Sequence, residues 1–178
     1  MAQTSPAERP LWARRHPLEV ADAARRTTAY VYGNVLVLAA LAVVSPEDVS
    51  TGRGFWLVIG TAVSTFVAHV FAEAMGDQVK HPEPISTRTV LRLARESFPV
   101  LTSGVLPAAI LLVGWWGWLE PDPAVLLADA VVLLRIAGTG VVVARLRDQR
   151  SSVRIFAAGI GLAVVGAAIS GLKVYLTH

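Results

Sequence analysis

The chain contains no cysteine, and only 16% of its 178 residues are charged. Without cysteine there is no disulfide, no thiolate metal site and no cysteine nucleophile. A soluble domain of this size carries about 25% charged residues, so the low charge argues against an ordinary globular protein. Because 54% of the residues are hydrophobic, the chain is also unlike a disordered protein, which has few hydrophobic residues and many charges.

Sequence patterns of common enzymes are also missing. The chain has no Gly-rich phosphate loop, no zinc-protease signature and no serine nucleophile elbow. His69 and Glu73, one helical turn apart, would supply two metal ligands, whereas a complete site takes three or four. We therefore expect no enzyme, no catalytic residue, no cofactor and no metal site.

Five long hydrophobic stretches are present. A transmembrane helix needs roughly 20 mostly apolar residues to cross about 30 Å of hydrocarbon, and none of the stretches alternates with the period of two that a strand requires. They cover residues 28–45, 55–75, 98–118, 123–144 and 155–175. We expect an all-α integral membrane bundle of five transmembrane helices, in a transmembrane domain over 28–178 that follows a basic cytoplasmic segment over 1–27.

The basic residues give this bundle an orientation. Of the 16 lysines and arginines, all but three precede the first stretch or lie between stretches two and three or four and five. The other two connections contain only Arg53, and Arg135 and Lys173 fall inside stretches. The positive-inside rule then predicts a cytoplasmic amino terminus and an external carboxyl terminus. Tryptophans at the predicted outer ends agree with this, and the net charge of +3 requires no nucleic-acid partner.

The second stretch carries polar residues at every fourth position, which places them in one stripe on a helix. They are Thr61, Thr65, His69, Glu73 and Asp77. Ionisable groups in hydrocarbon cost several kcal/mol unless they are sheltered or hydrated. We expect the stripe to face other helices, a partner subunit or water.

Polar residues of other stretches reach a similar depth. At ~1.5 Å per residue, Asn34, His69 and Arg135 lie roughly 2–6 Å to the cytoplasmic side of the membrane centre. Arg135 is expected to pair with Glu73, with backbone carbonyls or with another subunit, or to attract an anion. His69 could relay protons, since imidazole titrates near neutral pH, or be a neutral side chain bonded to Asn34 or a threonine. Asp129 and Lys173 form a second candidate pair in the outer half.

Three further features bear on assembly. Small residues spaced by four in the last stretch let helices approach closely, within one subunit or between subunits; they are Gly159, Ala163, Ala167 and Gly171. Pro107 is expected to kink the third stretch. Two basic segments could lie on the membrane surface and contact anionic lipid: one opened by Pro17, and 85–96, in which Ile85, Val90 and Leu93 oppose Arg88, Arg92 and Arg95.

Two segments, YVYGNVLVLAAL and FVAHVFAEAMGD, resemble a family of small uncharacterised bacterial polytopic membrane proteins. In that family the first helix carries a Tyr-Gly pair and the second an Ala-His pair. The matching residues here are Tyr32 with Gly33 and Ala68 with His69. The resemblance implies a similar helix layout and a multi-pass location in the bacterial plasma membrane, but it implies no activity.

Two functions fit these patterns. The first is a homo-oligomeric channel or small transporter that passes ions or protons between subunits. Its lining would be Asn34, Thr61, Thr65, His69, Glu73 and Arg135. The alternative is a non-conducting membrane module that binds a partner protein or lipid, with the polar groups fixing helix packing.

Overall fold

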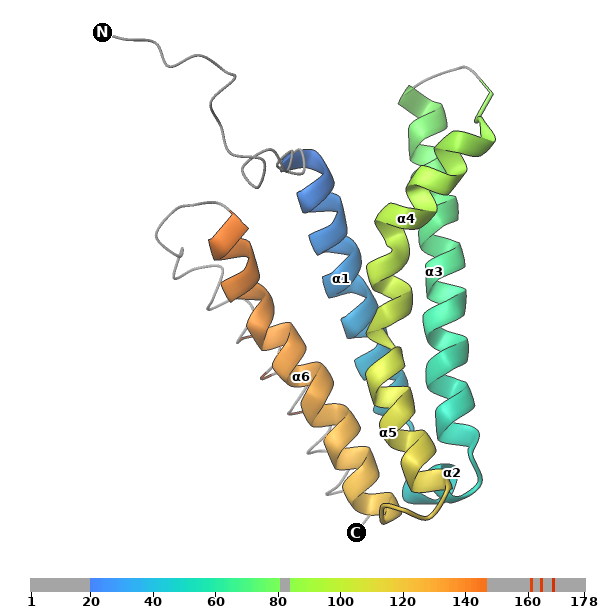
Figure 1. Ribbon diagram of the computed structural model, residues 1–178, viewed down its shortest axis with the longest axis vertical. Helices are drawn as coiled ribbons and strands as arrows, with labels where there is room; N and C mark the ends of the chain where they lie inside the picture. Colours follow the sequence, from blue (N-terminus) through green and yellow to red (C-terminus); the bar gives the residue numbers. More distant parts are fainter. Residues whose placement is uncertain (1–19, 81–83, 147–160, 162–163, 165–167, 169–178) are drawn as a thin grey trace, which may run out of the picture.

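The computed structural model describes residues 20–80, 84–146, 161, 164 and 168, and in these residues all regular structure is helical. The helices are α1 (Val20–Leu41), α2 (Pro46–Ser50), α3 (Arg53–Lys80), α4 (Thr87–Ser103), α5 (Val105–Trp115) and α6 (Pro121–Leu146). The long helices α1, α3, α4 with α5, and α6 run along one axis in alternating directions, and short α2 closes one end (Figure 1). The expected all-α class is confirmed for this part of the chain.

Two of the described helices are long and apolar enough to cross a membrane, Arg53–Val79 and Thr87–Trp115. The second, α4 continued by α5, begins eleven residues before the predicted position of 98. Ser86 starts it, because its hydroxyl accepts a hydrogen bond from the Thr89 backbone N–H at 3.2 Å. The basic segment 85–96 is therefore mostly the first turns of this long helix, and its position at a membrane surface stays a prediction.

Other helix boundaries in the structure also differ from the predicted ones. α1 begins at Val20 instead of 28, so the predicted domain boundary at 27 falls inside a helix. α6 covers the fourth stretch with two more residues at each end. Of the fifth stretch, 155–175, the structure describes only 161, 164 and 168, which are helical. Lys173 and the small residues Gly159, Ala163, Ala167 and Gly171 lie outside the described residues.

Near Pro107, where a kink is expected, the structure shows a break between two helices three residues earlier. The helix is interrupted at Gly104, which ends α4 and begins α5, and Pro107 occupies the first turn of α5. A proline in a first turn lacks an N–H that would have no partner within its own helix. Gly104 keeps helical dihedral angles (φ −82°, ψ −17°), so α4 and α5 together form the single span Thr87–Trp115.

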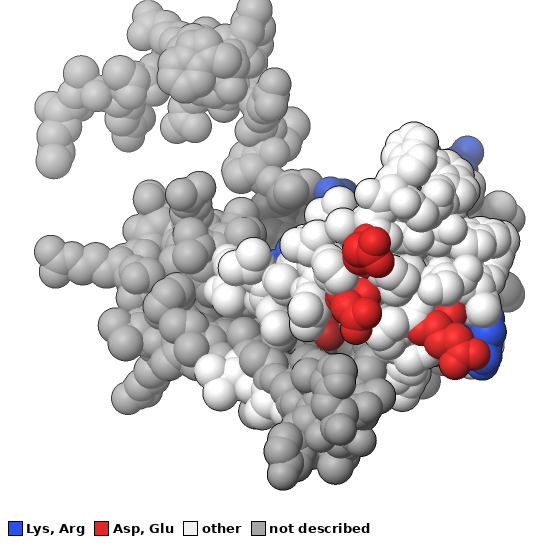
Figure 2. Space-filling view, turned by 90° about the horizontal axis from the view of Figure 1, so that it is seen from below, with Lys and Arg blue, Asp and Glu red and all other residues white. Residues whose placement is uncertain are grey.

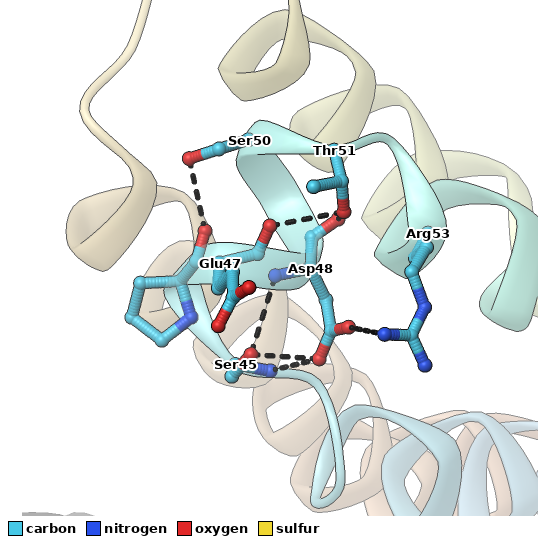
Figure 3. A network of polar contacts seen from close by, with 7 residues as sticks. Ser45, Glu47, Asp48, Ser50, Thr51 and Arg53 are labelled. Carbon is cyan, nitrogen blue, oxygen red and sulfur yellow. Dashed lines mark hydrogen bonds and ion pairs between the residues drawn. The ribbon is translucent and has the colours of Figure 1, made fainter.

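One end of the bundle is acidic. It holds α2 and the α5–α6 turn, with Glu47, Asp48, Glu120 and Asp122. Figure 2, which looks onto this end, shows the acidic groups on a mostly uncharged surface. Ser45 and Asp48 cap α2 reciprocally: the Asp48 carboxylate accepts from the Ser45 N–H at 2.9 Å, and the Ser45 hydroxyl accepts from the Asp48 N–H at 3.2 Å (Figure 3). Asp48 also pairs with Arg53 at 3.5 Å.

The opposite end is basic. It gathers the start of α1, the α3–α4 connection and the end of α6 (Figure 1). In the described part, its arginines include Arg25 and Arg26 of α1 and Arg88, Arg92 and Arg95 of α4. The alternation of helix directions therefore collects the basic connections at one end, as the charge pattern of the sequence predicts.

The helices touch most closely where glycine removes a side chain. A Cβ placed on Gly33 of α1 would lie 2.8 Å from both the Ser103 hydroxyl oxygen and the Val100 Cα of α4. Val100 and Ser103 are themselves completely buried. Gly33 thus marks a close contact between α1 and α4, whereas the neighbouring Tyr32 stacks on His69 of α3.

Candidate functional site

Helix α3 turns most of its polar stripe toward the bundle, beside the buried Val58, Ala62 and Ala74, and exposes many of its large apolar side chains. Thr65 is buried and Thr61, His69 and Glu73 are half-buried, on a helix that packs against α1 and α4. Only 17% of its most apolar 18-residue window is buried. Large apolar side chains of α3 are 42–62% exposed: Trp56, Leu57, Val63, Val67 and Phe71. This distribution reverses the one that a helix has on the surface of a water-soluble bundle.

Arg135, near the middle of α6, joins three helices. Its Nε donates to the Tyr30 hydroxyl of α1 at 3.2 Å, and its Nη1 donates to the Ser103 backbone carbonyl of α4 at 3.1 Å. The guanidinium carbon also lies 5.4 Å from the centre of the Tyr30 ring, within the range of a cation–π contact. The side chain therefore makes its contacts with two helices at once.

The sequence explains why the Ser103 carbonyl is available. In a continuous helix it would accept from the N–H of the residue four positions later, which is Pro107 and has no N–H. An unpaired buried carbonyl costs about 1–3 kcal/mol, and Arg135 removes that cost. Pro107 of α5 thus leaves the Ser103 oxygen without its helical donor, and Arg135 of α6 donates to that oxygen instead.

Asn34 belongs to the same cluster. It is completely buried, and its Nδ2 donates to the Tyr30 backbone carbonyl at 2.7 Å. Its Oδ1 has no hydrogen-bond partner among the described residues. Asn34, Tyr30, Ser103 and Arg135 are referred to below as the arginine clamp.

Glu73 is not part of the clamp, so the predicted Arg135–Glu73 pair is not the contact that forms. Of the partners expected for Arg135, the backbone carbonyl is the one observed. Glu73 instead lines a small cavity with His69, at the junction of α1, α3 and α4. The polar residues predicted at a similar depth therefore form two separate groups, the clamp and the lining of the small cavity. Depth along a helix does not determine the direction in which each side chain points around it.

His69 is held between a ring and charged groups. Its imidazole stacks on Tyr32 of α1, with ring centres 5.7 Å apart and planes 29° apart. The cavity beside it is lined by Arg25, His69, Glu73, Leu93, Glu96 and Ser97. Its volume, ≈ 10 Å³, is about what one water molecule needs. Neither Asn34 nor a threonine, the expected partners of a neutral histidine, lines this cavity.

Glu96 of α4 is a site residue that the sequence reading missed. Its side chain is only 10% exposed, and it accepts from Arg25 of α1 at 3.2 Å and from Arg92 at 3.4 Å. The Arg92–Glu96 pair could have been predicted from the sequence, since these residues are four positions apart and share a helix face. What the sequence lacks is any sign that Arg25 lies opposite them.

A larger groove opens at the basic end. Its volume is ≈ 410 Å³, and its lining consists of Arg26 from α1 and Arg88, Leu91, Arg92, Arg95 and Glu96 from α4. Positions 88, 92 and 95 fall on one face of a helix, because they are separated by four and three residues. The groove therefore faces outward between the first turns of two helices.

The other residues predicted for the site belong neither to the clamp nor to the lining of the small cavity. Asp129 is buried in α6, and its expected partner Lys173 lies outside the described residues. Thr61 donates to the Leu57 carbonyl of its own helix at 2.8 Å. Within the described part of the chain, no three histidine, aspartate or glutamate side chains lie close enough to hold a metal ion.

Comparisons of the chain with protein-family models, with curated proteins and with solved structures found no match. The function is therefore argued from the geometry of the clamp, the small cavity and the basic groove.

Proposed function

We propose that the chain is a multi-pass protein of the bacterial plasma membrane, with five transmembrane helices, a cytoplasmic amino terminus and an external carboxyl terminus. The outward apolar face of α3 supports this placement, since 17% burial argues against the core helix of a soluble protein. Exposed tryptophans at the acidic end support it further, because tryptophan favours the membrane–water interface; these are Trp56, Trp116 and Trp118. The arginines at the opposite end would then face the cytoplasm.

This placement predicts which end reacts with a membrane-impermeant thiol reagent. Because the chain has no cysteine, single cysteine variants give an unambiguous readout. In intact cells we expect Glu120→Cys, at the exposed acidic end, to be labelled by an impermeant maleimide. Thr87→Cys, exposed at the basic end, is expected to react only after the cells are permeabilised. Equal labelling of both variants in intact cells would refute the proposed topology.

Within the membrane, we propose that the protein is a non-conducting module that binds anionic lipid at its basic end. The observation that carries this is the arginine clamp: the polar groups at the centre of the bundle are bonded to one another across α1, α4 and α6. The cavity beside His69 has room for about one water molecule. Both features are typical of polar groups that fix helix packing. Of the two openings described above, the basic groove is the larger and is the one proposed to bind lipid.

A second candidate is a homo-oligomeric channel or transporter for ions or protons. Two observations favour it: His69 and Glu73 line the same cavity, and the buried Asn34 Oδ1 has no hydrogen-bond partner among the described residues. Asn34 and Thr65 are buried within one protomer. A passage lined by them would therefore run through the bundle, and not between subunits as the sequence predicts.

Flux through proteoliposomes separates these two functions. We expect purified protein to give no proton or ion flux above protein-free vesicles over a range of pH and voltage. His69→Ala should then change nothing, and Ser64→Ala, an exposed hydroxyl on the same helix, serves as the control. Flux that His69→Ala abolishes and Ser64→Ala preserves would establish the second function and overturn the first.

A further inference from the structure

Four guanidinium groups surround the groove at the basic end, from Arg26, Arg88, Arg92 and Arg95. Arginine stays charged at any pH that the protein experiences. Like charges gathered around one opening repel each other, so the arrangement is unfavourable unless an anion balances it. Among the described residues that line the groove, Glu96 is the only acidic one.

Glu96 does not supply that balance. Its two carboxylate oxygens are already occupied, one by Arg25 at 3.2 Å and the other by Arg92 at 3.4 Å. Arg25 belongs to the small cavity beside His69 and is not in the groove lining. Arg26, Arg88 and Arg95 form no ion pair with any other described residue. Three cationic side chains therefore point at the groove without a counter-charge from the described part of the protein.

We propose that this groove binds a phosphate-bearing anion. The planar guanidinium presents paired N–H donors that match the spacing of phosphate oxygens, which makes arginine the preferred residue for such groups. Arg88, Arg92 and Arg95 would grip the anion from α4, and Arg26 from α1. The groove volume of ≈ 410 Å³ is within the usual range of about 300–1,000 Å³ for small-molecule sites.

The apolar surroundings favour a phospholipid headgroup as the source of the phosphate. Leu91 lies in the groove wall and is 54% exposed, and Phe98, two turns further along α4, is also 54% exposed. A lipid could place its phosphate among the arginines and its acyl chains along these side chains. This choice of source rests on the proposed membrane placement, whereas binding of the phosphate itself does not.

The test measures binding to the full-length protein in dodecyl maltoside micelles, by calorimetry, with three probes. These are dioctanoyl phosphatidic acid, zwitterionic dioctanoyl phosphatidylcholine, and inorganic pyrophosphate. We expect saturable binding of phosphatidic acid, weakened roughly 10- to 30-fold in the double variant Arg88→Gln/Arg95→Gln, since two cationic contacts are lost. Arg53→Gln, which removes an exposed arginine at the acidic end, should leave the affinity unchanged.

Each outcome decides something. Binding of phosphatidic acid alone, with this arginine dependence, identifies a lipid headgroup. Binding of pyrophosphate with the same dependence assigns the groove to a free phosphate compound and counts against lipid binding as the function. Equal affinity for phosphatidylcholine, or affinity that the double variant does not change, overturns the proposal. An unchanged unfolding midpoint of the double variant shows that a loss of binding is not a loss of fold.

Discussion

Arg135→Lys is expected to destabilise the bundle more than Arg135→Met, although lysine keeps the charge. The guanidinium reaches the Tyr30 hydroxyl and the Ser103 carbonyl from two different nitrogens and also lies by the Tyr30 ring. An ammonium is a compact point charge and cannot cover both positions from one stem. Lysine would therefore leave a poorly paired cation inside the bundle, whereas methionine loses the hydrogen bonds and removes the charge with them.

The two costs can be compared. Hydrogen bonds between helices in membranes average about 0.6 kcal/mol, with a maximum near 1.7 kcal/mol. Methionine loses both bonds and leaves the Ser103 carbonyl unpaired, so we expect a cost of about 1–3 kcal/mol for this variant. Leaving a buried charge without its partner costs about 3–5 kcal/mol. Because Arg135 is only half-buried, we expect about 2–4 kcal/mol for lysine. The measurement is the free energy of unfolding in mixed micelles, followed by tryptophan fluorescence.

A double-mutant cycle with Tyr30→Phe separates the hydroxyl from the ring. Phenylalanine keeps the aromatic face near Arg135 and removes only the hydrogen-bond acceptor. The cycle should give a positive coupling free energy of about 0.5–1.5 kcal/mol between Tyr30 and Arg135. If lysine proves no worse than methionine, or the coupling is zero, the clamp does not hold these helices together.

The interior position of Arg135, and a backbone carbonyl as one of its possible partners, could be predicted from the sequence, but not which carbonyl it would be. The charge pattern and the cost of exposing an arginine to hydrocarbon were enough to turn it inward. Its main acceptor, however, is a backbone oxygen, and that oxygen is free because Pro107 follows four residues later. A pattern of side chains carries no direct record of such an atom. Pro107 already identifies the Ser103 carbonyl as the one that loses its helical partner, but the sequence does not show that Arg135 of α6 lies beside it.

The starts of two helices also differ in how well the sequence predicts them. The Ser45-Pro46-Glu47-Asp48 sequence carries a capping box with proline in the first position, so α2 could have been predicted from known capping patterns. The start of α4 at Thr87 was hidden for a different reason. Its first turns carry Arg88, Arg92 and Arg95 and read as a surface helix, whereas buried Leu93, Glu96 and Ser97 on the other face pack into the bundle. Charge at one end of this candidate membrane span masked its continuity with the apolar part.

Gly33→Ala is expected to destabilise the bundle by about 1–3 kcal/mol, which is the usual cost of overpacking a close contact. The new Cβ would lie 2.8 Å from the Val100 Cα, a backbone atom that cannot rotate away. α1 and α4 must separate instead. Alanine is the better helix former by about 1 kcal/mol, so the prediction requires that the clash outweigh that gain. The measurement is the same unfolding experiment in mixed micelles.

Gly76→Ala on α3 is the matched control, because a Cβ there meets nothing within 4 Å. Only the helix-propensity gain remains, so this variant should be neutral or more stable by up to about 1 kcal/mol. Equal effects of the two substitutions would show that the α1–α4 contact is not tight. The Gly33 site also touches the clamp, since its Cβ would press on the Ser103 hydroxyl at 2.8 Å. Displacing Ser103 moves the carbonyl that Arg135 binds, so Gly33→Ala combined with Arg135→Lys should cost less than the two single changes added together.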